Sequence, residues 1–380
     1  MATTQHPPEG LAVILTIPRD ELARALYCLQ GVVERKPLVP INGHALLEAK
    51  GGQLRVAATD GDVSLSATRP VEIGQSASVA VAARQFYDII KSLPNDEVIL
   101  GKKDGGLLVT CASSSFRLAT LPADQFPALP SAKGSDTWTM PASELNRMLE
   151  RALSCVSQDD SRHNLAGVFF EPQENEGLRL VSTDGHRLAL VEGQVSGHKL
   201  PKEGVLLPRK GLTELRRVLS DAPKDAAVSV GTLRQGAVFT CAGVTLTTRA
   251  IEAVFPDYRQ VLPAPGDRRA VFPRDVLQDA VRRVSIVSRG GSWGVRVKLS
   301  DGRAILEAED PTLGEASETL DLAYHGEACT VGFNARYLLD ALSLMDKGDV
   351  ELRLVDEMSP GLLAPADGGG FTALVMPMRV

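Results

Sequence analysis

The chain of 380 residues has few cysteines and no long apolar run, and both shortages exclude classes of protein. Its five cysteines are an odd number, are scattered and never form a C-x-x-C pair, which argues against a zinc site and a disulfide framework. No apolar run approaches the ~20 residues that span a bilayer, and the start, MATTQHPPEG, lacks the charged and apolar regions of a signal peptide. We therefore expect a cytosolic protein with reduced, mostly buried thiols.

Catalytic signatures are also missing. The sequence contains no G-x-x-x-x-G-K-[ST] phosphate loop, no dinucleotide-binding G-x-G-x-x-G and no H-E-x-x-H. Of only six histidines, His186 alone has a suggestive neighbourhood, beside Asp184 and Arg187. Because alternate side chains of a strand face opposite ways, these three cannot converge on one reacting atom. We expect no enzyme, no metal and no cofactor; a repeat-built hydrolase using His186 is a remote alternative.

The composition is that of an ordinary folded chain. Hydrophobic residues make up 44% of it, and the mean hydropathy is -0.01, so apolar residues for a core are ample. At this length the expectation is about two or three domains, since single cores rarely grow beyond roughly 250 to 300 residues.

Internal repeats organise the sequence. Three segments begin alike: TIPRDELARALYCL from Thr16, TMPASELNRMLERAL from Thr139 and VFPRDVLQDAVRRV from Val271. In each, a proline suited to a first helical turn precedes acidic residues and an apolar pattern of helical period. A second helical pattern appears midway through each repeat, and short alternating strands separate the helices. The predicted helices cover 18–36, 82–93, 141–153, 208–220, 273–287 and 334–347.

The tripeptide Thr-Asp-Gly occurs twice, with Asp60 and Asp184, in similar apolar settings about one domain length apart. Asp and Gly supply the backbone geometry of a tight connection between strands. The pattern predicts the same turn in two copies of one domain, and EAEDPTL is the altered form in the third copy.

Charge is distributed unevenly along the chain. The net charge is -6, which by itself argues against nucleic acid, yet basic residues outnumber acidic ones within the six helix windows. If the helices share one face, that face is basic and the rest is acidic. A basic stripe of this kind is the electrostatic signature of a protein that binds the phosphate backbone.

Several motifs together resemble one family. RKPLVPINGHALLEA, STDGHRLAL, LLPRKGLTEL, FPDYRQVLP, VGFNARYLLDAL and the terminal VMPMRV are similar to the bacterial sliding clamps, the beta subunits of DNA polymerase III. The resemblance implies an α+β fold of three tandem repeats of a DNA-clamp domain, each a doubled helix-plus-strands unit, with helices lining a ring and sheets outside. It implies clamp domains at 11–130, 135–263 and 270–380, after a tail at 1–10.

The resemblance also implies the function and the partners. Members form a ring-shaped homodimer that encircles double-stranded DNA without sequence preference and tethers replicative and repair polymerases. Peptides from the polymerase III alpha subunit, the clamp loader and repair proteins bind a pocket between the second and third domains. By similarity, the DNA-binding residues are Arg35, Lys36, Arg84, Arg147, Arg209, Lys210, Arg282 and Arg283.

The peptide pocket is carried over in the same way. Methionines there would adapt to several peptide sequences, and a small apolar cleft would bury one or two anchor side chains. The implied pocket residues are Leu165, Thr183, Gly185, His186, Arg187, Leu188, Pro256, Val261, Met358, Leu374, Met376, Pro377, Met378 and Arg379.

Some positions depart from the family pattern. His163 and Asn164 stand where an aromatic pair is common, at the rim of the implied pocket. At the implied dimer interface, serines occupy 113–115 where basic residues are common, so we expect few ion pairs there. Phe116 and Leu118 against Ile286 and Val287 then carry more of the contact. A specialised clamp paralogue, for repair or inhibitor resistance, is an open alternative to the main replicative clamp.

Overall fold

The structure, a computed structural model, describes residues 12–34, 36–130, 137–159, 161–174, 176–197, 203–233, 235–262 and 268–379. The chain forms two compact units, Met1–Leu145 with Lys210–Ala250, and Asn146–Arg209 with Ile251–Val380. The predicted second domain, 135–263, therefore contributes strands to both units. No helix in the described ranges is long and apolar enough to cross a membrane.

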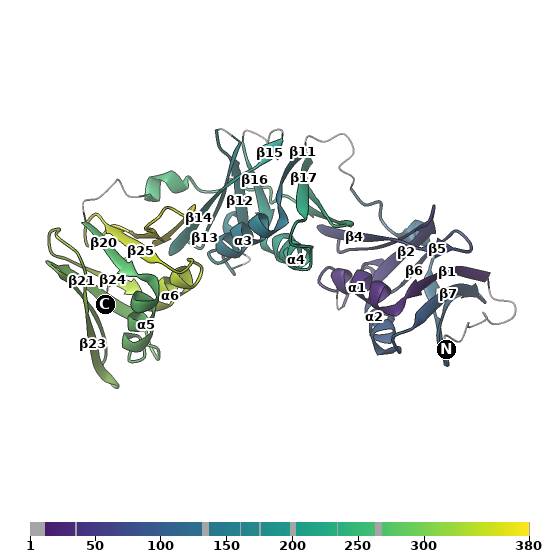
Figure 1. The fold of residues 1–380 in the computed structure, drawn as a ribbon, viewed down its shortest axis with the longest axis horizontal. Helices are drawn as coiled ribbons and strands as arrows, with labels where there is room; N and C mark the ends of the chain where they lie inside the picture. The colour runs from purple at the N-terminus through teal and green to yellow at the C-terminus, as the bar shows by residue number, and fades with distance from the viewer. Residues whose placement is uncertain are drawn as a thin grey trace. The chain divides into compact units, whose positions relative to one another are not determined.

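The first unit contains two sheets, drawn in Figure 1 from purple to blue with the teal strands that follow α4. Its elements are β1 (Ala12–Pro18), α1 (Arg19–Leu29), η1 (Pro40–Gly43), β2 (His44–Lys50), β3 (Gln53–Thr59), β4 (Val63–Pro70), β5 (Glu72–Ile73), β6 (Ala77–Ala82), α2 (Ala83–Ser92), β7 (Glu97–Lys103), β8 (Gly106–Cys111), β9 (Ser114–Leu118), β10 (Thr120–Leu121), η2 (Ala123–Gln125), β11 (Thr137–Pro141), α4 (Arg209–Ser220), β17 (Ala227–Leu233), β18 (Gly236–Cys241) and β19 (Val244–Arg249).

The second unit is also built from helices and strands. Its elements are α3 (Ala142–Leu153), η3 (His163–Leu165), β12 (Gly167–Pro172), β13 (Gly177–Thr183), β14 (Arg187–Gln194), β15 (Ser196–Gly197), β16 (Val205–Pro208), η4 (Tyr258–Val261), β20 (Arg268–Pro273), α5 (Arg274–Val284), β21 (Gly294–Ser300), β22 (Arg303–Asp310), β23 (Gly314–Asp321), β24 (Cys329–Asn334), α6 (Ala335–Ser343), β25 (Asp349–Leu354), β26 (Gly361–Pro365) and β27 (Phe371–Val375).

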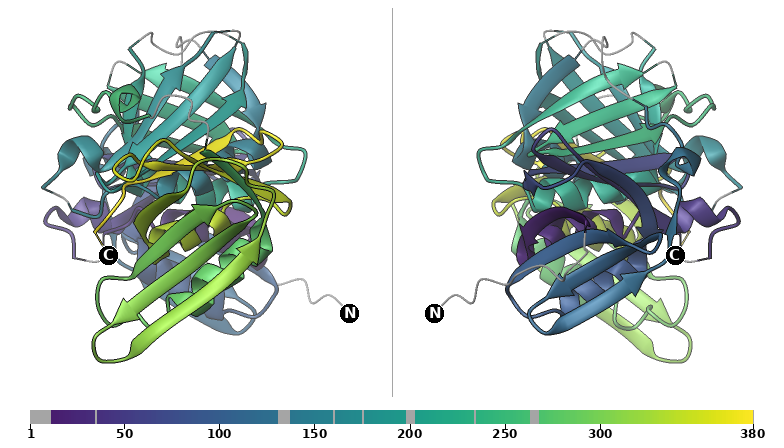
Figure 2. Two further views of the ribbon diagram at one scale, coloured as in Figure 1. Left: turned by 90° about the vertical axis from the view of Figure 1, so that its left-hand side faces the viewer. Right: turned by 90° about the vertical axis from the view of Figure 1, so that its right-hand side faces the viewer.

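Each unit is built around one long sheet and one short sheet of antiparallel strands. In the first unit the short sheet has the order β5-β1-β7-β8-β9, and the long one includes β10-β6-β2-β3-β4-β19-β18-β17-β11. In the second unit the orders are β23-β22-β21-β24 and β16-β12-β13-β14-β27-β26-β25-β20. Figure 2 presents the four-stranded sheet of the second unit toward the viewer in its left panel, with helices behind it. The fold class is α+β, as predicted.

The six predicted helices are confirmed, with small differences at their ends. The largest difference is at α1, which ends at Leu29 although the apolar pattern continues to Val33. Gly31 follows the helix, and a Cβ atom at this position would overlap with the Glu214 carboxylate on α4. A side chain at position 31 would therefore require the Glu214 side chain to move. Glycine is also a poor helix former, which favours an end of the helix here.

The helices α1, α3 and α5 bury residues at the same four spacings after their prolines, as three copies of one amphipathic helix should. The buried sets are Leu22, Ala25, Leu26 and Leu29 in α1, Leu145, Met148, Leu149 and Ala152 in α3, and Leu277, Ala280, Val281 and Val284 in α5.

Both Thr-Asp-Gly sequences form the predicted turn. The Oδ1 atom of Asp60 accepts hydrogen bonds from the backbone N–H groups two and three residues later, at 2.9 and 2.7 Å. Asp184 accepts the equivalent pair at 2.9 and 3.1 Å, and Asp310 in the third copy does so at 2.8 and 3.1 Å. The glycines have φ of +98° at Gly61 and +90° at Gly185, a region that L side chains rarely adopt. The third copy keeps the aspartate but not the glycine.

All five cysteines are free, and four of them are buried. The prediction that the thiols are mostly buried is confirmed. Burial raises the pKa of the Cys155 thiol to about 11, so the thiol is neutral at physiological pH.

Replacing Gly31 with Ala should lower the free energy of unfolding by about 1–3 kcal/mol, because the added methyl group overpacks a filled site. Urea unfolding followed by circular dichroism measures the change. Gly290→Ala is the matched control, since a Cβ atom there meets nothing within 4 Å. In a Glu214→Ala background the Gly31→Ala substitution should cost much less; equal costs in both backgrounds would exclude the steric origin.

Candidate functional site

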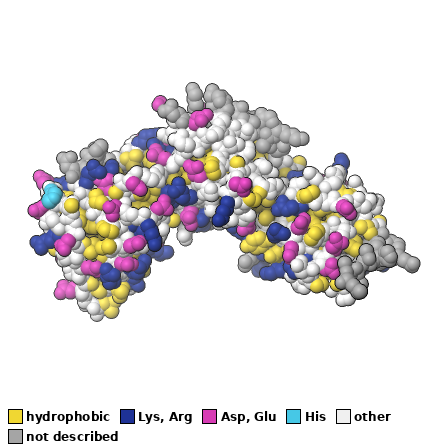
Figure 3. All heavy atoms as spheres, in the orientation of Figure 1, with side chains coloured by type: hydrophobic (Ala, Val, Ile, Leu, Met, Phe, Trp, Pro, Cys, Tyr) yellow, Lys and Arg dark blue, Asp and Glu magenta, His cyan; other side chains and the backbone are white. Residues whose placement is uncertain are grey.

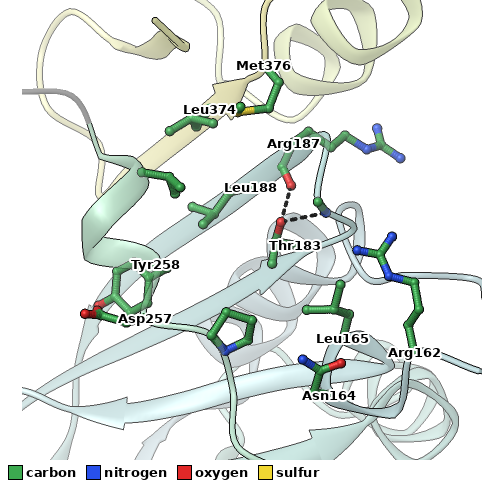
Figure 4. A pocket seen from close by; sticks show the side chains of 13 residues that line it. Arg162, Asn164, Leu165, Thr183, Arg187, Leu188, Asp257, Tyr258, Leu374 and Met376 are labelled. Atoms are coloured by element: carbon green, nitrogen blue, oxygen red, sulfur yellow. Dashed lines mark hydrogen bonds between the residues drawn. The ribbon is translucent and has the colours of Figure 1, made fainter.

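A cavity of about 340 Å³ lies in the second unit, where β14 pairs with β27. Figure 4 shows that the lining residues come from three sources: the strands of the sheet, the loop before β12, and the segment around η4. The lining residues are Arg162, Asn164, Leu165, Thr183, Gly185, Arg187, Leu188, Pro256, Asp257, Tyr258, Val261, Leu374 and Met376.

The floor of the cavity is apolar because two neighbouring strands place leucines opposite each other. Leu188 on β14 pairs in register with Leu374 on β27, and both are almost completely buried. Met376 packs at the edge of the same apolar cluster, and its backbone N–H donates to the His186 carbonyl at 2.9 Å. A methionine at this edge gives the floor an adaptable surface.

The Thr-Asp-Gly turn forms one rim of the cavity. The Thr183 hydroxyl donates to the Arg187 carbonyl at 2.7 Å and accepts from the Gly185 N–H at 3.0 Å, the two dashed lines in Figure 4. Arg162 crosses the turn and donates to the Asp184 carbonyl at 2.8 Å. Because Gly185 has no side chain, the guanidinium can lie directly against its backbone.

The opposite wall is the segment that carries η4. The buried Tyr258 hydroxyl donates to Glu171 at 2.6 Å and accepts from Arg179 at 3.0 Å. Burial, and then the hydrogen bond to Glu171, raise the pKa of Tyr258, so the hydroxyl stays protonated and keeps donating. Arg259 forms an ion pair with the same glutamate. These bonds hold the wall against the sheet.

Arg187 connects the rim with helix α6. Its guanidinium pairs with Asp184 at 3.0 Å and with Asp340 at 2.6 Å, and it lies 4.5 Å from the centroid of the Tyr337 ring. The group is only 16% exposed, so its two carboxylate partners compensate a largely buried charge. Arg187 therefore joins β14 to α6 beside the cavity.

An apolar floor with a polar, charged rim suits the side chains of a short peptide. Pockets of ~300 Å³ and more commonly take such ligands, with apolar anchors buried and a few polar groups fixing their orientation. In the described part of the chain no group of His, Cys, Asp and Glu side chains could hold a metal ion.

Most of the pocket residues implied by the family resemblance line this one cavity, and five do not. His186 is exposed and is not among the lining residues. Met358 is 75% exposed, and Pro377, Met378 and Arg379 follow the last lining residue. The assignment of these residues as peptide contacts stays a prediction.

The sequence reading did not assign Arg162, Asp257 and Tyr258 to the pocket, although they line the cavity. Asp257 and Tyr258 lie within the motif FPDYRQVLP, and Arg162 directly precedes His163 and Asn164, which depart from the family pattern, so the signal was present. Of the two residues expected at the rim, Asn164 lines the cavity and His163 does not.

Several basic residues expected at DNA have partners within the protein. Arg35 lies outside the described residues, and Lys36 is exposed. Arg84 is half-buried, and its Nη2 donates to the Val33 carbonyl at 2.9 Å, so its geometry is that of a cap for the end of α1.

The other basic residues are exposed on the helices. Arg147 pairs with Asp346 at 3.4 Å, Arg282 with Asp279 at 2.5 Å and Arg283 with Glu318 at 2.6 Å, while Lys210 pairs with Asp60. Arg209 also has a partner within the protein. Figure 3 shows Lys and Arg interspersed with Asp and Glu on the face that it presents. Exposed pairs contribute only ~0–1 kcal/mol each, so a phosphate could replace the carboxylates.

The residues expected at the dimer interface lie at two sheet edges or near them. Phe116 and Leu118 are half-buried on β9, the edge of the five-stranded sheet. Ile286 follows α5 and is 56% exposed, and Val287 is half-buried. β23 is one of the two edges of the four-stranded sheet.

Comparison with known proteins covers nearly the whole chain. Family models match three consecutive stretches: the N-terminal domain of the DNA polymerase III beta subunit at residues 13–130, its central domain at 139–257 and its C-terminal domain at 259–379. The beta sliding clamp of Pseudomonas putida is 38% identical over 370 residues, 96% of this chain and 99% of the relative. That of Escherichia coli K12 is 33% identical over 367 residues, with the same coverage.

Solved structures agree with the family models. The DNA polymerase III subunit beta of Pseudomonas aeruginosa superposes with a TM-score of 0.90 at 35% identity, over 96% of this chain and 100% of that chain. A sliding clamp of Bartonella birtlesii bound to griselimycin gives a TM-score of 0.89 at 31% identity, over 97% and 100%. The chain therefore belongs to the bacterial DNA polymerase III beta subunit family and is a DNA sliding clamp, a processivity factor without catalytic activity of its own.

Proposed function

We propose that two copies of this clamp close head to tail into a ring around duplex DNA in the cytoplasm and tether polymerases through the cavity described above. In this proposal each copy contributes three domains, 11–130, 135–263 and 270–380, after a tail at 1–10. The observation that carries the proposal is a strand pairing between repeats that occurs twice within the chain. In each unit, one further strand equivalent to these paired strands lies at a sheet edge.

Two pairings join successive repeats within the chain. β4 pairs with β19 through Ser64 and Thr247, and β14 pairs with β27 through Leu188 and Leu374. The first strand of each pair begins directly after an aspartate turn, as β23 does after Asp310.

The strand β9 corresponds to β19. Both follow a turn whose alanine has positive φ, +50° at Ala112 and +47° at Ala242. β9 and β23 are sheet edges among the described strands, and unpaired edges are templates for pairing with another chain. A second copy supplies the missing partner for each, and the two pairings close a ring with twofold symmetry.

The residues that follow the helices support an apolar contact between the two copies. Ile286 stands at the same distance after its helix proline as Gly31, the residue that packs against α4 at the internal junction. The exposed Ile286 and its neighbour Val287 would face the partner's β9, where Phe116 and Leu118 are half-buried.

DNA contact is proposed for Arg35, Lys36, Arg147, Arg209, Lys210, Arg282 and Arg283. Arg84 is a weaker candidate for DNA contact, because its guanidinium already donates to the Val33 carbonyl after the end of α1. Phosphate contacts position a protein without reading sequence, which suits a clamp that slides.

The cavity is proposed to bind peptides of the polymerase III alpha subunit, the clamp loader and repair polymerases. The Bartonella birtlesii clamp bound to griselimycin shows that a relative binds a ligand. Here the apolar floor supports anchor side chains, and the polar rim supports orientation of the peptide.

The first test concerns the interface. Phe116→Ala should weaken dimerisation strongly, since loss of a buried aromatic side chain costs roughly 3–5 kcal/mol and the contact occurs twice per dimer. Sedimentation equilibrium measures the dissociation constant, with Arg117→Ala on the same strand as the control for charge. Strong salt dependence of the parent dimer with an unaffected Phe116→Ala variant would show that charges hold the ring.

The second test concerns the cavity. Met376→Ala should weaken binding of a polymerase-type peptide by about 1–3 kcal/mol, the usual cost of truncating an anchor contact, and leave the dimer intact. Calorimetry measures the affinity. Val276→Ala on α5 is the control, because Val276 is exposed and outside the lining of the cavity. Equal affinities of parent and Met376→Ala would place the peptide elsewhere.

The third test concerns topology. With a clamp loader and ATP, the protein should be retained on circular DNA and released when the circle is cut, because a ring holds DNA without a specific contact. Gel filtration of labelled protein before and after linearisation measures retention. Retention on linear DNA at physiological salt would contradict encirclement.

A further inference from the structure

One polar residue in the lining of the peptide cavity has unused hydrogen-bonding groups. The cavity is lined by the polar side chains of Arg162, Asn164, Thr183, Arg187, Asp257 and Tyr258. All of them except Asn164 form hydrogen bonds within the protein. The Asn164 carboxamide has no hydrogen-bond partner in the described part of the chain, and no dashed line reaches it in Figure 4.

The neutral and acidic groups of the lining are already used to hold the walls. The hydroxyls of Thr183 and Tyr258 each donate one hydrogen bond and accept another within the protein. The Asp257 carboxylate accepts from the backbone N–H of Arg259 at 3.3 Å and from Nε2 of Gln260 at 3.1 Å. A ligand would have to compete with these bonds.

The two arginines of the lining can only donate. Arg162 donates to the Asp184 carbonyl at 2.8 Å, and Arg187 donates to the carboxylates of Asp184 and Asp340. A guanidinium has no acceptor atom. Among the lining side chains in the described ranges, Asn164 is therefore the only one with both a free donor and a free acceptor.

The short helix η3 fixes the position of this carboxamide. The backbone N–H of Leu165 donates to the Arg162 carbonyl at 2.8 Å, and the Leu165 carbonyl accepts from the Ser157 N–H at 3.0 Å. The Leu165 side chain is almost completely buried and anchors the turn. Asn164 itself is half-buried, so a ligand can reach its amide, and little freedom is lost on binding.

The apolar floor makes this amide selective. A peptide whose apolar side chains cover Leu188 and Leu374 removes water from the cavity, and the carboxamide then needs new partners. An amide group supplies both, because its C=O accepts from the Asn164 NH2 group and its N–H donates to the Asn164 oxygen. A carboxylate would satisfy only the donor, and an ammonium group only the acceptor.

We propose that Asn164 is a specificity-determining residue of the peptide cavity, and that its carboxamide bonds to an amide group of the bound peptide. That group belongs either to the peptide backbone or to a glutamine or asparagine side chain. The inference rests on the proposed function of the cavity. An aromatic pair is common at positions 163 and 164 in the family, so this clamp has a polar contact where the family pattern has a ring.

Calorimetry of the full chain with a synthetic clamp-binding peptide of the polymerase III alpha subunit tests the inference. Asn164→Asp keeps the size of the side chain but replaces its donor by a second acceptor, and we expect about tenfold weaker binding. Asn164→Leu removes both groups and should weaken binding at least as much. His163→Leu is the matched control and should bind as the parent does, because His163 lies on the same turn, is exposed and does not line the cavity.

Peptides changed at one residue at a time identify the group that Asn164 binds. If the partner is a side-chain amide, one alanine-substituted peptide should bind the parent and Asn164→Asp with equal affinity. If the partner is a backbone amide, every alanine-substituted peptide should keep the difference, and N-methylation at one position should remove it.

The Met376→Ala variant separates this inference from the proposed function. If Asn164→Asp binds as tightly as the parent while Met376→Ala binds more weakly, the peptide occupies the cavity and the role of Asn164 is overturned. If neither variant changes the affinity, the peptide binds elsewhere and both proposals are wrong. Sedimentation equilibrium checks that each variant dimerises as the parent does.

Discussion

Antiparallel pairing between strands of different repeats is the interaction on which the rest of this clamp depends. A single repeat leaves the backbone N–H and C=O groups of its outer strands without partners, and pairing β4 with β19 and β14 with β27 satisfies them while making each long sheet continuous. The same constraint makes β9 and β23 the natural edges for a second copy. The proposed closure of the ring would thus extend a pairing already used twice within the chain.

The aspartate turns add charge to these junctions. Asp60 pairs with Lys210 on α4, whereas Asp184 pairs with Arg187, which in turn pairs with Asp340 on α6. One turn geometry therefore carries two different ion-pair arrangements. The ion pairs of Asp184 lie beside the apolar cavity. Arg187 therefore belongs both to the rim of the cavity and to the contact between β14 and α6.

Equivalent positions of different repeats carry different side chains, and this difference allows the repeats to have separate roles. Leu188 with Leu374 and Ser64 with Thr247 occupy the same place in register, so both pairs rest on the same backbone pairing. Side chains facing away from the core are free to change, because the buried faces of the strands already supply the packing energy. One junction can thus bind apolar side chains while the other presents hydroxyls.

The sequence by itself determined the repeats, the six helices and the aspartate turns, because these depend on local periodicity, proline and backbone conformation. It also identified most residues of the cavity, but only because motifs of the chain resemble those of the bacterial sliding clamps. Tertiary structure alone placed the Glu214 carboxylate of a distant helix against Gly31, directly after the end of α1. It likewise decided that Tyr258 faces the cavity and His186 does not, and that Arg84 bonds to the Val33 carbonyl. Each of these outcomes depends on which distant side chain or carbonyl lies within reach, and no local pattern contains that information.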